Sequence, residues 1–160
     1  MGGRAVALAT LVAFAWCTVA CGSDGGRVSA HEFTRRAAAL CSHADRRATS
    51  EDLPPLDGAG TAKAVGRIIA IERDALHRLH DLKPPKAMET RVDEWLATVD
   101  QLVVEAEFLQ ESLRHGDQHT AQDVAIRAAR LSLRSQVLGS RLGITGCTVP
   151  TPPPVDPSNE

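Results

Sequence analysis

Apolar residues recur at alternating steps of four and three residues between Pro84 and Gly116. The positions on this stripe are Met88, Val92, Trp95, Val99, Leu102, Ala106, Leu109 and Leu113. Only a helix brings residues at this spacing onto one face, and Leu96 and Val103 widen that face beyond a two-helix seam. Because proline is tolerated in the first helical turn and glycine commonly follows the last, the pattern predicts one helix here that faces several neighbours.

Two amphipathic stretches precede this one. A helix is expected over residues 30–49, because Ser29 and Glu32 have the spacing of a capping box. A second helix is expected from Thr61, as its N-cap, to a stop near Lys83, because residues before proline avoid the helical region.

The last predicted helix begins after Asp117 or Thr120, either of which can serve as N-cap, and Gly143 is its expected C′ residue. Four amphipathic helices joined by mostly short connections predict an all-α fold. We expect an antiparallel up-down-up-down four-helix bundle over residues 29–147, in which the first and last helices are neighbours.

The start of the chain has the pattern of an export signal. In residues 1–20, Arg4 precedes an apolar run that is shorter than a membrane span. The following Thr-Val-Ala-Cys resembles the lipobox of bacterial lipoproteins, which implies a signal peptide of residues 1–20 and lipid attachment at Cys21. Ordinary cleavage after Ala20 is the alternative, and it leaves Cys21 as a free thiol.

Two segments are expected to stay outside the packed core. The Gly-rich residues 21–28 predict a flexible tether between the lipid and the bundle. The Pro-rich residues 148–160 predict a disordered tail.

The four cysteines support the lipoprotein interpretation. Cys17 leaves with the signal and Cys21 takes the lipid, so Cys41 and Cys147 remain as a pair in an exported, oxidising compartment. We therefore predict a disulfide between Cys41 and Cys147.

Three features recur together along the predicted bundle. They are Cys41 on the first helix, a Leu-rich element that ends in Pro-Pro at residues 79–85, and Leu142-Gly143 followed by Cys147. Their combination resembles small exported α-helical lipoproteins of actinobacteria. The resemblance implies a lipid-anchored protein on the extracytoplasmic face of the cell membrane, and it implies no catalytic residue.

Glu72 is the one residue that the packing pattern does not favour, because it falls in the middle of the apolar stripe of the second helix. An unpaired carboxylate there is costly. Counting turns places Trp95, Ser135 and Arg36 near the same level, where the first two can donate hydrogen bonds and the guanidinium can neutralise the charge. We expect a polar layer of these four residues that fixes helix register or binds a ligand.

Composition and motifs argue against several functions. The formal net charge is −2 and the few aromatic residues are scattered, so nucleic-acid binding is not expected. We recognise no phosphate-binding loop, nucleophile elbow or paired-carboxylate cleft, and we expect neither enzyme activity nor a cofactor. The six histidines lack the inward Glu-x-x-His pairs of di-iron bundles, so we expect no metal site.

The sequence thus favours a non-enzymatic cell-envelope lipoprotein that serves as a helical interaction or scaffolding module. Its expected partners are the membrane, through the N-terminal lipid, and an envelope protein that the sequence does not identify. The alternative is a bundle that binds a small ligand or a metal at the cell surface. The first function requires an exposed apolar or charged patch, whereas the second requires polar groups that converge inside.

Overall fold

The computed structural model describes residues 26–52, 54, 59–145 and 147. The predicted signal, the predicted lipid-attachment residue Cys21, most of the predicted tether and the predicted tail lie outside these residues. Within them the chain is all-helical, with four α-helices, one short 3₁₀-helix and no strand.

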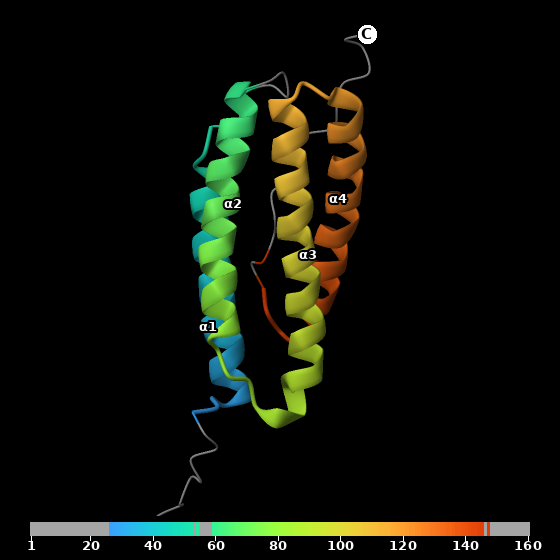
Figure 1. Ribbon diagram of the computed structural model, residues 1–160. Helices are drawn as coiled ribbons and strands as arrows, with labels where there is room; N and C mark the ends of the chain where they lie inside the picture. The colour runs from blue at the N-terminus through green and yellow to red at the C-terminus, as the bar shows by residue number, and fades with distance from the viewer. Residues whose placement is uncertain (1–25, 53, 55–58, 146, 148–160) are drawn as a thin grey trace, which may run out of the picture.

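The helices follow one another along the chain and pack side by side. They are α1 (Ala30–Thr49), α2 (Ala59–His80), α3 (Glu89–Arg114) and α4 (Gln118–Arg141), and the one-turn helix η1 (Lys86–Met88) leads into α3. Close backbone contacts join α1 to α2, α2 to α3 and α3 to α4. Figure 1 shows the four helices as an elongated group of rods.

Local side-chain and backbone chemistry sets several helix ends as expected. The Ser29 hydroxyl accepts a hydrogen bond from the backbone N–H of Glu32 at 3.2 Å and caps α1. Of the two residues proposed to cap α4, Asp117 does so, accepting from the backbone N–H of Thr120 at 3.0 Å. Gly143 has a φ of +75° just beyond α4, which a residue with a side chain rarely adopts.

The start of α2 differs from the prediction. Thr61 is fully buried inside the first turn of this helix, which begins at Ala59, so it does not cap the helix. The helix also ends at His80, three residues before the expected stop, and the backbone then tightens, with the Leu82 N–H donating to the Leu79 carbonyl.

The core runs through the contact between the helices, with Trp95 and Phe33 as its largest fully buried side chains. Small residues of α1 (Ala37, Ala44, Ala48) are also buried, which is consistent with a core that has few aromatic rings. A packing of small and branched side chains brings neighbouring backbones close together.

The chain after α4 changes the packing that was expected between the first and last helices. No close contact comparable to the others joins α1 to α4 within the described residues. Instead, Leu142 and Ile144 are buried, and the Leu142 carbonyl accepts a hydrogen bond from Thr34 Oγ1 of α1 at 3.3 Å. In Figure 1 this segment, coloured red, turns back along the bundle. Residues 142–147 therefore link α4 to α1.

A disulfide joins Cys41 of α1 to Cys147, as predicted. It connects residues that are 106 positions apart, with their Cα atoms 4.7 Å from each other. The bond holds the chain after α4 against α1.

Candidate functional site

A small cavity lies among the four helices beside the disulfide. Each helix contributes one polar residue to its lining: Asp45 from α1, Glu72 from α2, Trp95 from α3 and Ser135 from α4. Its volume is about 30 Å³, which is enough for a water molecule and far below the several hundred Å³ of a small-molecule pocket.

Glu72 occupies the wall of this cavity because its position on α2 follows the apolar face. Ala75, Leu76 and Leu79 of the same helix also line the cavity. The carboxylate is half-buried and makes no hydrogen bond or ion pair with any residue that the structure describes. Burial, with the charge of Asp45 as the second cause, raises the pKa of the Glu72 carboxyl above its ordinary value.

Trp95 is completely buried, and its indole N–H has no hydrogen-bond partner within the described chain. The ring lies against Gly139 of α4. A methyl group at Gly139 would lie 3.4 Å from Trp95 Nε1 and 3.6 Å from the Ile144 carbonyl oxygen. Leaving a buried donor unpaired lowers the stability of the folded protein by roughly 1–3 kcal/mol. A hydrogen-bond acceptor beside the indole N–H would remove this cost.

Arg36 does not take part in this layer. Its guanidinium is half-exposed and pairs with Glu32, one turn earlier on α1, where Arg35 binds the same carboxylate. A partner four residues away on the same helix is within easy reach, whereas the cavity lies deeper in the bundle. These two arginines hold the pKa of the Glu32 carboxyl below its usual value.

Asp45 is the lining residue that the sequence reasoning missed. It follows Cys41 by four residues and therefore lies on the same side of α1 as the disulfide. That spacing was a usable signal, since Cys41 lies on the buried face of α1. Two carboxylates, a hydroxyl and an indole N–H thus surround the cavity.

The described residues offer little for metal or thiol chemistry. No three His, Cys, Asp or Glu side chains among them converge as metal ligands. Near the α3–α4 turn, imidazoles and carboxylates form two separate pairs, His115 with Glu111 at 2.8 Å and His119 with Asp123 at 3.6 Å. Cys41 and Cys147 are bonded to each other and provide no free thiol.

A larger cleft of about 610 Å³ lies at the end of the bundle where α2 turns into α3. Arg27 reaches across this turn, donating to the Pro84 carbonyl at 2.7 Å and to Glu89 at 2.8 Å. The backbone N–H of Val28 donates to the Lys83 carbonyl at 3.1 Å. The predicted tether therefore extends too far in sequence, because hydrogen bonds hold its last two residues to the turn.

The large apolar side chains that remain exposed are confined to two helices in the described part of the chain. They are Val104 and Phe108 of α3 and Ile126, Leu133 and Val137 of α4. The three residues of α4, which we call the α4 stripe, are spaced by seven and four positions and share one helical face. Leu133 is the most exposed of them, at 64%.

Within the described residues, no helix has both the length and the apolar content to cross a membrane. No protein-family model, curated protein or solved structure matches this chain.

Proposed function

We propose that this protein is an exported, lipid-anchored helical module that binds a partner protein in the cell envelope and catalyses no reaction. The lipobox-like residues before Cys21 support the anchor, and a disulfide between Cys41 and Cys147 is what an oxidising compartment allows. The anchor keeps the module at the membrane surface, where α3 and α4 are available to the partner.

The α4 stripe is the observation that supports the binding role. A single exposed apolar residue is ordinary, but three on one helical face form a row that a second helix can cover. Arg130 lies within this row and Arg141 beyond it, and neither has an ion pair among the described residues. We therefore propose a partner helix with an apolar face and acidic flanks.

We also infer that the helices form an antiparallel up-down-up-down bundle. Consecutive helices contact one another, and the connection between α3 and α4 is only three residues long. A connection this short favours antiparallel neighbours. The order of colours along the helices in Figure 1 is compatible with this topology.

A ligand held inside the bundle is the other candidate that the sequence raised. The cavity beside Glu72 has room for water but not for a typical small molecule. We therefore do not propose an internal ligand as the function.

Photo-crosslinking in intact cells tests the proposal. A crosslinking amino acid at Leu133 should yield one discrete adduct with another protein, and the same residue at His43, exposed on α1, should yield none. Arg130→Glu should weaken the Leu133 adduct severalfold, because it repels an acidic partner. Intact-mass spectrometry of the same membrane fraction should show a diacylated Cys21 at the N-terminus.

Three outcomes would contradict the proposal. An adduct of twice the mass of the chain would show that the α4 stripe contacts a second copy of this protein and not a different partner protein. Equal crosslinking from Leu133 and His43 would mean that the α4 stripe is not a specific surface. An unmodified N-terminus in the culture supernatant would refute the anchor.

A further inference from the structure

Three hydrogen bonds hold the beginning of α1 to the turn between α2 and α3. Val28 donates to the Lys83 carbonyl, and Arg27 bridges the Pro84 carbonyl and the Glu89 carboxylate. These partners are more than fifty residues apart in the sequence. The position of Arg27 therefore also fixes the position of the turn.

The length of chain before Arg27 limits where a lipid anchor can be. Six residue steps separate Cys21 from Arg27, and a chain extends by at most about 3.6 Å per residue, so the two lie within roughly 20 Å. The 26 residues of α3 span about 39 Å at 1.5 Å per residue. An anchor at Cys21 therefore keeps the turn end of the bundle close to the membrane surface.

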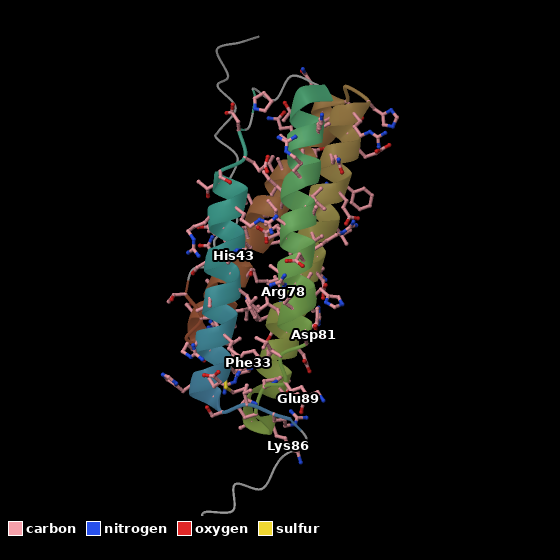
Figure 2. The ribbon with its side chains drawn as sticks, turned by 90° about the vertical axis from the view of Figure 1, so that its left-hand side faces the viewer. Phe33, His43, Arg78, Asp81, Lys86 and Glu89 are labelled. Carbon is pink, nitrogen blue, oxygen red and sulfur yellow. A yellow bond between two sulfur atoms is a disulfide. The ribbon has the colours of Figure 1, made fainter. Side chains whose placement is uncertain are left out.

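Around the cleft at the turn end, three cationic side chains (Arg27, Lys83 and Lys86) accompany two carboxylates (Glu89 and Asp93), and the exposed Asp81 of the same turn lies 3.5 Å from His77. Two of the chain's three lysines, Lys83 and Lys86, lie in this turn, are exposed and have no ion pair among the described residues. Glu89 is occupied by Arg27, which leaves Asp93 as the acidic group of the cleft without an ion pair there. In Figure 2 Lys86 lies at the extremity of the molecule, with Glu89 further in.

We propose that this end of the bundle, formed by Arg27 and the turn with Lys83 and Lys86, rests on the membrane and that the two lysines contact anionic lipid headgroups. The proposal rests on the lipid anchor proposed above. Pro84 and Pro85 stiffen the backbone between the two lysines. Each lysine near an anionic surface contributes about fivefold in affinity.

Vesicle binding of the mature chain without its lipid tests this contact. Residues 21–160 with Cys21→Ser contain every residue that the structure describes and both cysteines of the disulfide. At low ionic strength this chain should bind phosphatidylglycerol-containing vesicles and bind phosphatidylcholine vesicles at least tenfold less. The double variant Lys83→Ala/Lys86→Ala should lose about 25-fold in binding to the anionic vesicles.

Lys63→Ala provides the matched control, because Lys63 is exposed near the other end of α2. It changes the net charge by the same amount as Lys83→Ala or Lys86→Ala alone, and it should alter binding to the anionic vesicles less than twofold. Equal losses for Lys63→Ala, Lys83→Ala and Lys86→Ala would overturn the proposal, and so would equal binding to both kinds of vesicle. The anchor fails separately: an unmodified Cys21 in cells together with lysine-dependent binding refutes the anchor and leaves the lipid contact standing.

Discussion

Glu72 and Trp95 set the chemistry at the level of single residues. A half-buried carboxylate and a buried indole N–H line the same cavity, and neither has a partner in the described part of the chain. A well-packed core normally avoids both situations, because each leaves a desolvated polar group uncompensated. One small space in the core therefore contains two polar groups that lack compensation.

Glu72→Gln should raise the melting temperature by a few degrees at pH 7 and change it little near pH 4. Burial raises the pKa of the Glu72 carboxyl in the folded protein, so the folded state binds this proton more tightly than the unfolded state. The residue therefore costs stability when ionised, and the cost disappears as the pH falls through the raised pKa. Calorimetry at both pH values measures the difference between variant and wild type.

That difference is the right quantity to compare. The pKa values of Glu32 and Asp117 are lowered in the folded state, so these residues lose stabilising interactions as the pH falls and obscure Glu72 in the wild type alone. A difference that is the same at both pH values would show that Glu72 is fully solvated.

Counting helical turns was sufficient to place three of the four predicted layer residues beside one cavity. Glu72, Trp95 and Ser135 lie on three helices whose periodicity is regular, so their levels could be calculated from sequence. The assignment of Arg36 to the layer was wrong because its guanidinium forms an ion pair with Glu32, one turn away on the same helix, and not with Glu72. The unpaired state of Trp95 Nε1 depends on three-dimensional packing and has no sequence signal.

The helices themselves were predictable because their signals are local. The α1 prediction matches the structure at both ends, and a side-chain cap or a glycine of positive φ marks several other helix ends. The segment after α4 was not predictable as a packing element, because it is short and has no periodic pattern. Its role as the link between α4 and α1 emerges only from contacts between distant residues.

Ile144→Ala should destabilise the fold by about 2–4 kcal/mol, because it removes a buried branched side chain where the chain returns to α1. Leu133→Ala is the control, since that side chain is 64% exposed and its loss should cost less than about 0.5 kcal/mol. Urea unfolding followed by Trp95 fluorescence measures both. Equal effects of the two substitutions would mean that residues 142–147 do not support the bundle.

At the scale of the whole molecule, each helix packs closely against the next one in sequence, and a disulfide connects the chain after the last helix to the first helix. α1 packs closely against α2, whereas its connection to α4 runs through the segment that contains Leu142, Ile144 and Cys147. A cross-link over 106 residues restricts the unfolded chain strongly, and in the chain-entropy model such a bond is worth roughly 4–5 kcal/mol. This is a large share of the stability of an ordinary domain.

Cys147→Ser should therefore lower the melting temperature by roughly 16–20 °C, at about 4 °C per kcal/mol for a domain of this size. Cys41→Ser should have the same effect, and the double variant should be no worse than either single one. A reducing agent should lower the melting temperature of the wild type and leave the variants unchanged. Labelling of both native cysteines by a thiol reagent in the folded protein would contradict the bond.

The position of Cys147 after the last helix has a consequence for how the protein matures. Export from the N-terminus, as proposed, would present the thiols of Cys21 and Cys41 long before Cys147 follows. Twenty residues separate the first two, and a short loop closes at a lower entropic cost than one of 106 residues. Acylation of Cys21, as proposed, removes the competing thiol. If acylation of Cys21 precedes oxidation, Cys41 pairs with Cys147. If oxidation comes first, Cys41 can pair with Cys21 instead.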